Sequence, residues 1–537
     1  MENSKEKRVL NGFITGFGLF LLFFLLMYML RNRMHFNSDE YDNILGGTII
    51  GNGGEVYKNF VSQHTPLMYY LCALVYLLGV RTVIMYRLFM FAGLSLLWVI
   101  MFFRYRKHFG SIPMFIYPLS YIALMFTTDK LSHCILSEQV QSQALVILLL
   151  EFLTYTRIKN FKISNYFWIS FSVLFSFGTA FVSIYPIFII ALGVLSIEIA
   201  NLIKTGKSDK SIISKETKQF FVKGIVLVIS CLVPFIILII VYAVKGNIKN
   251  AVYGIYTVNR IYYPKYGGAE SSILKSFLGP INIFKATMKN TGMFTVNLAL
   301  ISAMLYSIVV MRKKGIFRGI VCLGFIYMTA MRSMSDFHGL PFLSAGMCFF
   351  GLTVGEGISI LKSNKDFMKM SRLKQSITVF SIVFILLSPF ELTFLWEIRA
   401  GSLKFNKSEY VPQINKGSAE DVVTTLIAED EKFYDATITL LYVPTNRLPI
   451  NAPGLVCPWI YEAYHDRIFE TLENEKPKLI YLPDSFEVWG HNSKDFAADA
   501  YEYIRENYTS FESECGINGM YIINSYYENA KEIWSKH

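Results

Sequence analysis

The sequence predicts an α-helical polytopic membrane protein with a small C-terminal α/β domain. Of its residues, 53% are hydrophobic and 17% are charged, and apolar runs recur from Leu10 to Trp396. Such a composition with repeated long apolar runs is typical of membrane proteins. After Trp396 the chain becomes charged and tyrosine-rich, which indicates a folded domain in water.

The formal net charge of +11 reports orientation in the membrane and not a nucleic-acid partner. Lysine and arginine fall in short clusters between apolar runs, where the positive-inside rule places cytoplasmic loops. The first span, Leu10 to Leu30, lacks a small-residue cleavage site, so we interpret it as an anchor and not a removable signal peptide. Lys5, Lys7 and Arg8 before it predict a cytoplasmic N-terminus.

The run from Leu67 to Gly79 is shorter than the roughly 20 residues that span a bilayer. If it crossed, the next span would carry Arg104, Arg106 and Lys107 outside. We therefore predict that it lies at the interface, and that Val83 to Phe103 is the second crossing.

The same alternation assigns the remaining apolar runs in order and predicts about eleven spans, with the N-terminus inside and the C-terminus outside. The stretch from Asn165 to Ile203 is long enough for two spans bent near Gly178 to Pro186. The other predicted spans are Ile112–Thr127, Ile135–Tyr155, Gly224–Val244, Phe294–Met311, Ile316–Ala330, Pro341–Leu361 and Ile377–Trp396. A long outer loop is expected from Lys245 to Asn290.

We divide the chain into a transmembrane domain, residues 1–397, and an extracytoplasmic α/β domain, residues 398–537. Cys457 and Cys515 lie in the second domain and could pair, which the sequence does not decide. Expected strands are Ala436–Val443, Leu479–Leu482 and Met520–Ile523, and expected helices are Ser418–Ala428, Ala463–Leu472 and Phe496–Glu506.

The first candidate site is the acidic pair Asp39 and Glu40, just past the first span on the predicted outer side. On a helix, adjacent residues point about 100° apart, so only one of them is expected to do proton chemistry. The acidic pair is followed by a short predicted loop, which is bent by Gly46-Gly47 and Gly53-Gly54 and ends at His64-Thr65-Pro66. The alternative is that Ser38-Asp39-Glu40 only caps a helix.

The second acidic site is Asp129 and Glu138, in a predicted outer loop. A carboxylate from a separate outer loop is what a divalent metal or an acceptor hydroxyl would need opposite Asp39. The alternative is that Glu138 caps the following span.

Two further clusters are predicted on the outer side. Arg332 and His338 can bind a phosphate through charge-assisted hydrogen bonds, although Arg332 could instead reach lipid head groups. Asn259, Tyr262, Tyr263 and Lys265 suit a sugar or a lipid head group, although tyrosine is also the ordinary residue of a membrane interface.

Together these features resemble the GT-C glycosyltransferases. The shared pattern is a first span, an outer Asp-Glu pair, a glycine-bent loop, a Pro-Leu-x-Tyr-Tyr helix and a second outer acidic loop. Within the family, the chain is most similar to the protein O-mannosyltransferase and lipid A aminoarabinose-transferase type, which includes bacterial members of glycosyltransferase family 39. The resemblance covers about the first 200 residues well.

The resemblance implies an inverting sugar transfer from a polyprenyl-phosphate-linked donor to an extracytoplasmic glycan, lipid or protein, in the plasma membrane of a bacterium. It places the general base at Asp39 and an acidic partner at Glu138. His64 falls where some members have a carboxylate near the donor phosphate. The lysine that several members carry is missing from Phe181 to Tyr185, so Arg332, His338 or Lys265 would replace it.

No P-loop or paired zinc motif occurs in the chain, and a divalent metal is the only cofactor we consider. A lipid-linked glycan ligase or polymerase is the nearest alternative, because the central outer loop is long. A transporter or flippase is the other alternative, although the chain has no obvious inverted repeat.

Overall fold

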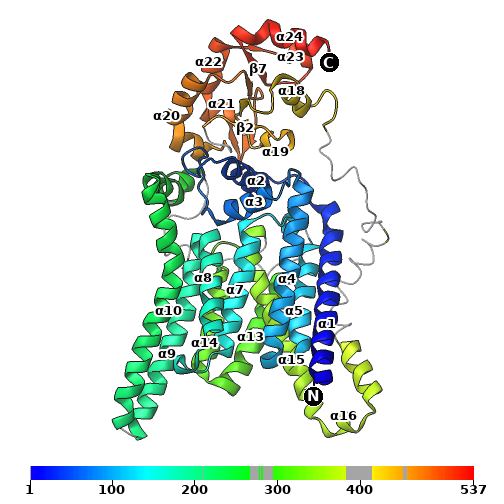
Figure 1. Ribbon diagram of the computed structural model, residues 1–537, viewed down its shortest axis with the longest axis vertical. Helices are drawn as coiled ribbons and strands as arrows, with labels where there is room; N and C mark the ends of the chain where they lie inside the picture. The colour runs from blue at the N-terminus through cyan, green and yellow to red at the C-terminus, as the bar shows by residue number, and fades with distance from the viewer. Residues whose placement is uncertain are drawn as a thin grey trace. The chain divides into compact units, whose positions relative to one another are not determined.

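The computed structural model describes residues 2–127, 129–208, 210–266, 277–278, 280–281, 294–334, 336–382, 399, 414–451 and 456–537. The chain divides into two compact units that are interleaved in sequence (Figure 1). We call Met1–His35, Met90–Ile237 and Leu274–Lys404 the helical unit, and Phe36–Phe89, Leu238–Ile273 and Phe405–His537 the mixed unit. The division at residues 397 and 398 stays a prediction, and both residues lie outside the described ranges.

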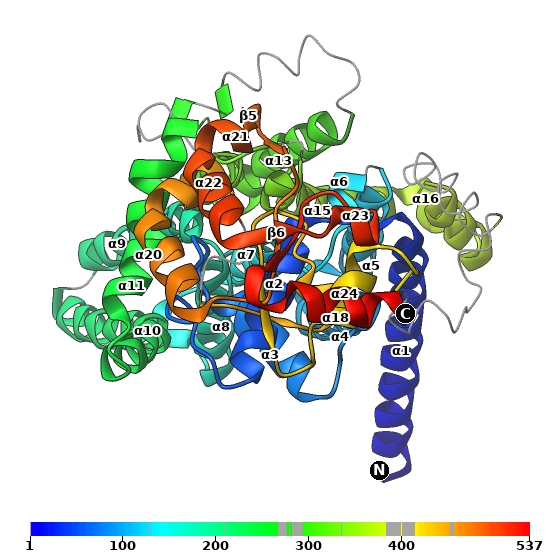
Figure 2. The same ribbon diagram turned by 90° about the horizontal axis from the view of Figure 1, so that it is seen from above.

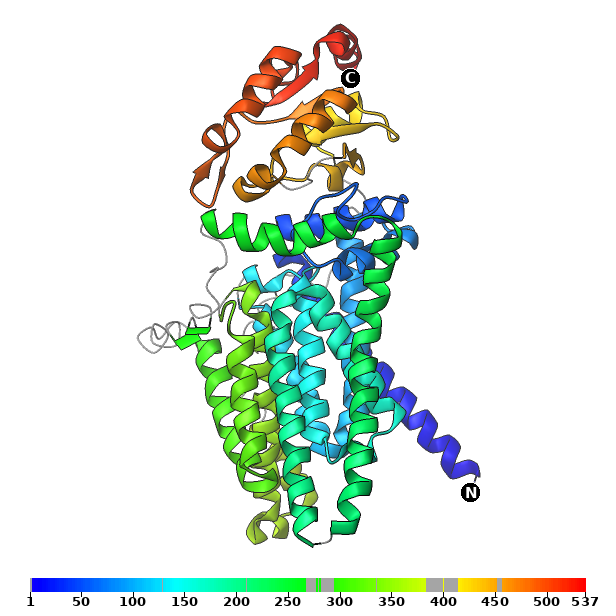
Figure 3. The same cartoon turned by 90° about the vertical axis from the view of Figure 1, so that its left-hand side faces the viewer.

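The helical unit is a bundle of long helices. Within it, α7 packs on α8, α15 packs on α5, α7 and α13, and α14 packs on α9 and α13. Figure 3 shows the N-terminal half of α1 leading away from the rest of this bundle, whereas Phe23 near its other end packs edge-on against Trp98. The elements are α1 (Glu2–Met29), η1 (Leu30–Arg33), α4 (Val83–Phe109, shared with the mixed unit), α5 (Ser111–Met125), α6 (Asp129–Ser132), α7 (Ser137–Thr154), η2 (Ile158–Asn160), α8 (Ile163–Thr179), η3 (Phe181–Ser183), α9 (Ile184–Ser208), α10 (Lys210–Val244, also shared), α13 (Phe294–Lys314), α14 (Ile316–Thr329), η6 (Phe337–Gly339), α15 (Leu340–Ser363) and α16 (Lys365–Lys369).

Five helical stretches among the described residues are long and apolar enough to cross a membrane: Val9–Met29, Val83–Phe109, Phe181–Thr205, Phe294–Lys314 and Phe337–Ser363. A bent pair within α10 would make six. The predicted number of eleven is therefore not confirmed. Two of the predicted spans are short helices, α5 with 15 residues and α14 with 14, or about 22 Å at 1.5 Å per residue. Most of the predicted span Ile377–Trp396 lies outside the described residues.

Two local predictions about helix length are confirmed. The stretch from Asn165 to Ile203 is broken where expected, because α8 ends at Thr179 and α9 begins at Ile184. The apolar run after Pro66 forms α3 (Leu67–Leu77), which has 11 residues and is too short to span.

In the mixed unit, the Gly46-Gly47 pair lies inside a helix and does not bend a loop, which corrects the prediction. Both glycines belong to α2 (Ser38–Gly51), which packs closely on α3. A Cβ atom on Gly47 would lie 2.4 Å from Cβ of Cys72, and one on Gly46 would lie 2.5 Å from the ring of Tyr69. The pair is therefore needed for close helix packing, and the actual turn comes at Gly53, whose φ is +85°.

The segment predicted as a long outer loop is helical in its described first part. It forms α11 (Ile248–Val252), a π-helix η4 (Tyr253–Tyr262) and a 3₁₀ turn η5 (Tyr263–Tyr266). The sequence did not predict these helical turns, since short π-helical segments have no characteristic spacing of apolar residues.

The C-terminal part of the mixed unit is the predicted α/β domain. Its five-stranded sheet has the order β2-β1-β3-β7-β6, with β1 parallel to β2 and β3 and with β7 antiparallel to both of its neighbours; β4 and β5 form a separate two-stranded ribbon. The elements are α18 (Ala419–Leu426), β1 (Lys432–Asp435), α19 (Tyr442–Thr445), β2 (Leu448–Pro449), α20 (Pro458–Glu475), β3 (Leu479–Tyr481), β4 (Glu487–Val488), β5 (His491–Asn492), α21 (Ser493–Phe496), α22 (Ala498–Asn507), β6 (Tyr508–Ser510), α23 (Glu512–Cys515), β7 (Met520–Ile523), η8 (Asn524–Tyr526) and α24 (Tyr527–Ser535).

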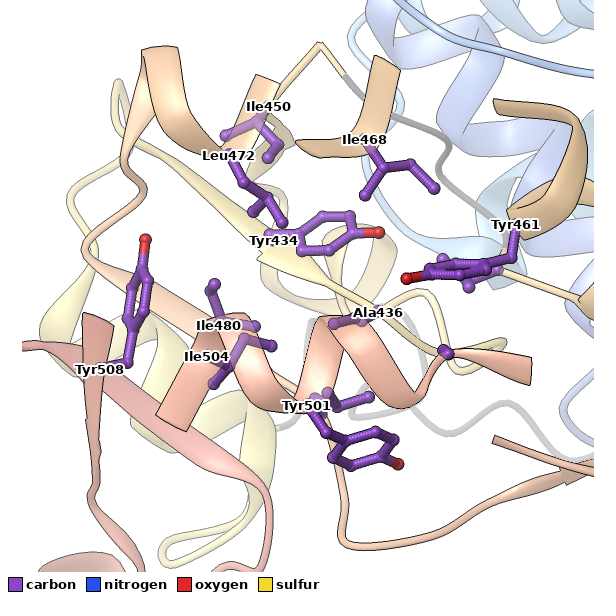
Figure 4. Packing of buried hydrophobic residues seen from close by; sticks show 14 residues of the cluster. Tyr434, Ala436, Ile450, Tyr461, Ile468, Leu472, Ile480, Tyr501, Ile504 and Tyr508 are labelled. Atoms are coloured by element: carbon purple, nitrogen blue, oxygen red, sulfur yellow. The ribbon is translucent and has the colours of Figure 1, made fainter. Parts of the chain in front are cut away.

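The core of this domain is built from β1 and β3 with the helices that flank them. Tyr434, Ile480, Ile468, Leu472 and Ile504 are nearly or fully buried and pack together (Figure 4). The strand predictions at Leu479–Leu482 and Met520–Ile523 are confirmed, as is the start of α18, where the Ser418 side chain accepts from the N–H of Asp421.

The strand predicted at Ala436–Val443 is wrong. The observed strand, β1, ends at Asp435, one residue before the predicted strand begins. The buried Asp435 carboxylate accepts hydrogen bonds from the N–H groups of Thr437 (2.9 Å) and Leu441 (2.8 Å) and from the hydroxyls of Thr437 (2.6 Å) and Thr439 (3.0 Å). These bonds satisfy the backbone locally and turn the chain out of the sheet. Burial is the main cause that raises the pKa of this carboxyl group.

We expect the segments near Asp39, Asp129 and Arg332 and the chain after Trp396 to face the outside, and the basic end of α4 to face the cytoplasm. The test is labelling of His35→Cys, Lys107→Cys and Glu429→Cys in intact cells with a membrane-impermeant maleimide. Wild-type protein is the background control, since five of its seven cysteines are buried. Labelling at Lys107→Cys without labelling at His35→Cys would reverse the predicted orientation.

Candidate active site

The first acidic segment opens α2, and its cap is Asn37 and not the Ser-Asp pair. The Asn37 side chain accepts from the N–H groups of Asp39 (2.9 Å) and Glu40 (3.1 Å). Asp39 is partly exposed in the first turn of the helix. Asn37 therefore provides the cap, while Asp39 and Glu40 lie in the first turn of the helix, where negative charge is favourable.

Glu40 is buried and paired. It has no exposed surface, and its Oε2 accepts from Nε (3.2 Å) and Nη2 (2.5 Å) of Arg87, which lies in α4. A carboxylate held by an arginine is strongly stabilised as an anion and is a poor proton acceptor. Of the adjacent pair, this geometry favours Asp39 for proton chemistry. Arg87 is a residue that the sequence reading missed, and its signal was a lone arginine inside an apolar run.

A second missed residue, Asp42, lies one turn after Asp39 and therefore on the same face of α2. It is 3% exposed. Its Oδ2 accepts from the hydroxyl of Tyr69 at 2.8 Å and lies 3.4 Å from Nδ1 of His64. Burial, followed by the negative charge of Asp42, raises the pKa of Tyr69 well above its ordinary value, so the phenol stays protonated and donates.

His64, a predicted site residue, lies against Asp42 of α2. Its ring is partly exposed, while its backbone carbonyl accepts from the hydroxyl of Tyr57 at 2.6 Å. Tyr57 is buried and has a φ of +69°, an unusual conformation for a residue with a side chain. Such strained positions persist only where the surrounding structure holds them, which indicates that this loop has a defined shape.

Asn259 reaches the same loop, because its Nδ2 donates to the carbonyl of Gln63 at 2.7 Å. The other predicted binding residues of this segment contact the α/β domain. Nζ of Lys265 lies 2.5 Å from Oε1 of Glu462, and the ring of Tyr263 packs against Trp459 at a centroid distance of 4.9 Å. The hydroxyl of Tyr262 accepts from that of Tyr253 at 3.3 Å.

The α/β domain contributes residues that are distant in sequence to an apolar cluster beside this loop. Val61, Val258, Cys457, Trp459 and Ile460 belong to one apolar cluster. Cys457 is a buried thiol. Both Cys457 and Cys515 are free, so the two do not form a disulfide. Burial raises the pKa of Cys457, and the charges of Asp39 and Asp42 raise it further.

The helical unit holds the other predicted site residues. Glu138 and the Arg332–His338 pair, predicted as separate sites, meet: Glu138 Oε1 lies 2.7 Å from Nη1 of Arg332 and 2.8 Å from Nδ1 of His338. Glu138 lies in the first turn of α7 and is 5% exposed. Asp129 begins the short helix α6.

No group of three or more His, Cys, Asp or Glu side chains suited to hold a metal occurs among the described residues. Glu138 has instead a guanidinium and an imidazole as partners, and a guanidinium is a poor neighbour for a second cation. The donor set around Glu138 therefore fits an anion better than a metal.

The solved structures that are similar to the chain include two of oligosaccharyltransferase from Archaeoglobus fulgidus. The first is the archaeal enzyme AglB in complex with an inhibitory peptide and a dolichol-phosphate, which is 11% identical, with 87% of this chain and 69% of that chain covered at a TM-score of 0.48. The second is the apo form, which is 10% identical, with the same coverage and a TM-score of 0.44. These values describe a distant likeness only. No family model and no curated protein matches the chain.

Proposed function

We propose that the chain is a membrane glycosyltransferase that moves a sugar from a polyprenyl-phosphate-linked donor to an extracytoplasmic glycan, lipid or protein, with Asp39 as general base. The observation that carries the proposal is the face of α2 on which Asp39 and Asp42 lie one turn apart, with His64 held against Asp42. Carboxylates on such a helix turn suit proton abstraction from an acceptor.

In the proposed reaction, the acceptor hydroxyl attacks the anomeric carbon of the sugar as its proton passes to Asp39. A bond forms between the acceptor oxygen and the anomeric carbon, while the bond from that carbon to the phosphate oxygen breaks. The leaving polyprenyl phosphate takes the electron pair. Because the acceptor attacks from the face opposite the leaving group in a single displacement, the anomeric configuration inverts. Its developing charge needs positive groups nearby.

The proposed roles of the other residues follow from their contacts. Asp42 and Tyr69 orient His64, which is then available to the donor phosphate or the acceptor. Glu40 and Arg87 anchor the first turn of α2. In the helical unit, Arg332 and His338 share Glu138, and a phosphate could replace that carboxylate with similar hydrogen-bond geometry.

The direct test uses the purified full-length chain in proteoliposomes with a panel of synthetic polyprenyl-phosphate sugars and an envelope extract as acceptor. We expect release of polyprenyl phosphate together with a glycosylated product, identified by mass spectrometry. Loss of the same glycan from the envelope of a deletion strain would identify the physiological acceptor. A folded protein that consumes no donor in the panel and leaves the envelope glycans unchanged on deletion would argue against the proposal.

We expect Arg332→Ala to weaken use of the lipid-phosphate donor more than use of the acceptor, since a charge-assisted hydrogen bond contributes roughly 1.5–3 kcal/mol. His338→Ala should have the same direction. The measurement is the apparent KM for donor and for acceptor in the liposome assay.

Glu138→Gln is the matched control, because it keeps the side chains of Arg332 and His338 and removes the carboxylate that contacts them. Its donor KM should stay the same or fall. Equal donor KM values in wild type and in both alanine variants would exclude Arg332 and His338 as the phosphate site and direct attention to His64.

A further inference from the structure

An apolar cavity lies in the helical unit between α7, α8, α9 and α10, away from every residue assigned above. Its volume is about 620 Å³, which is within the usual range for a ligand site. Its walls are almost entirely aliphatic and aromatic, with Phe152, Val173, Ile190, Phe220 and Leu232 among them. In Figure 2, α9 and α10 lie at one edge of the helical bundle.

This cavity is expected to be unstable both when it is filled with water and when it is empty. Apolar walls give water no hydrogen-bond partners, and an empty cavity costs stability in proportion to its volume. Lining residues of α10 are also substantially exposed, with Ile225 and Val228 each 56% accessible. An apolar cavity with exposed apolar residues along one wall, in a protein with membrane-spanning helices, is suited to a hydrocarbon chain of the bilayer.

One end of the cavity is positively charged. It is lined there by Tyr155 and Ile158, and the neighbouring Arg157 and Lys159 share one carboxylate, that of Glu216, at 2.7 Å and 2.9 Å. Further cations donate to uncharged backbone carbonyl oxygens in this region: Lys223 to Lys159, Lys314 to Leu153 and Arg318 to Tyr155. Two further carboxylates lie at this end: Glu151, which lines the cavity and pairs with Arg104, and Glu198, which accepts from the hydroxyl of Tyr155 and the N–H of Ile158. Six cations, those of Arg104, Arg157, Lys159, Lys223, Lys314 and Arg318, still outnumber the three carboxylates of Glu151, Glu198 and Glu216.

We propose that this cavity is a binding site for an anionic phospholipid, with an acyl chain between α7, α8, α9 and α10 and the phosphate near Lys159 and Lys223. The apolar walls select a hydrocarbon chain, and the excess of cations selects a negative head group over a zwitterionic one. This site is separate from the proposed sugar transfer, and it predicts lipid retention whether or not transfer occurs.

The test is native mass spectrometry of the full-length protein released from nanodiscs that contain equal amounts of phosphatidylglycerol and phosphatidylcholine. We expect retention of phosphatidylglycerol in preference to phosphatidylcholine. The Lys159→Gln/Lys223→Gln variant should lose about tenfold or more of this preference, as expected from loss of a charge-assisted contact. Lys365→Gln/Lys369→Gln, with two exposed lysines in α16, is the charge-matched control and should retain the lipid.

A second variant tests the cavity without changing charge. Gly224 lines the cavity, and a Cβ atom there would meet nothing within 4 Å. Gly224→Phe should therefore fill the space and displace the lipid while the protein keeps its thermal unfolding curve. Gly18→Phe, at another helical glycine with open space around it, is the matched control.

Three results would overturn the proposal. The first is equal retention of the two phospholipids, which would mean that no head group is recognised. The second is retention of neither. The third is displacement of phosphatidylglycerol by added undecaprenyl phosphate at stoichiometric amounts, which would assign the cavity to a polyprenyl chain instead.

Discussion

Asp39→Asn is expected to lower the rate of sugar transfer by about 10² to 10⁴, the usual cost of losing a general base. The amide keeps the shape of the side chain and removes its ability to accept the acceptor proton. The fold should persist, because Asn37 and not Asp39 provides the helix cap. The measurement is the rate of product formation in proteoliposomes at saturating donor.

Asp366→Asn is the control for this variant, because it makes the same chemical change at a side chain that is 91% exposed in α16. It should transfer at the wild-type rate. If a well-expressed Asp39→Asn protein also transfers at nearly that rate, the base is another residue. Asp42→Asn and His64→Gln would then be the next variants, since Asp42 shares the same helix face and His64 contacts it.

Arg87→Met should destabilise the protein by about 3–5 kcal/mol, because it leaves the buried charge of Glu40 without a partner. Glu40→Gln removes the other charge and should also destabilise. The double variant Glu40→Gln/Arg87→Met should be more stable than the sum of the two single effects implies. The measurement is the free energy of unfolding of the purified protein in detergent, completed as a double-mutant cycle.

The exposed pair Lys369 and Asp366, at 3.7 Å, provides the control cycle. Removing either member should change stability by less than about 1 kcal/mol. A coupling energy for Glu40 and Arg87 as small as that of the exposed pair would show that the buried contact does not anchor α2. The transfer rates of the same variants then show whether Glu40 has a structural or a catalytic role. If Glu40 were catalytic, a Glu40→Gln protein that remains folded would lose transfer activity.

Several features follow from local sequence alone. The apolar runs, the break between α8 and α9, and the short helix after Pro66 each depend on hydrophobic length and period within one segment. The same holds for β3, for β7 and for the Ser418 cap. Asp39 and His64 could be selected because a charged group beside an apolar run is conspicuous, and the structure places both on the segment that joins α1 to α3.

Other predictions failed because a neighbouring segment decides the outcome. Gly46 and Gly47 suggest a bend in sequence, but the close packing of α3 makes them part of a helix. The strand expected from Ala436 ends at Asp435 because its buried carboxylate binds the next turn. The helical segment from Ile248 to Tyr266 is stabilised by contacts with the α/β domain, such as that of Tyr263 with Trp459.

The sequence by itself determined the class of protein, the order of most helices and the residue types at the first acidic segment, since these depend on composition and local period. Only the tertiary structure decided which charges meet. It paired Glu40 with Arg87, held His64 against Asp42, and joined Glu138 to Arg332 and His338. The partners are separated by 22 to 200 residues, from Asp42 and His64 to Glu138 and His338. No local pattern encodes such contacts, because they arise from packing between segments that are distant in sequence.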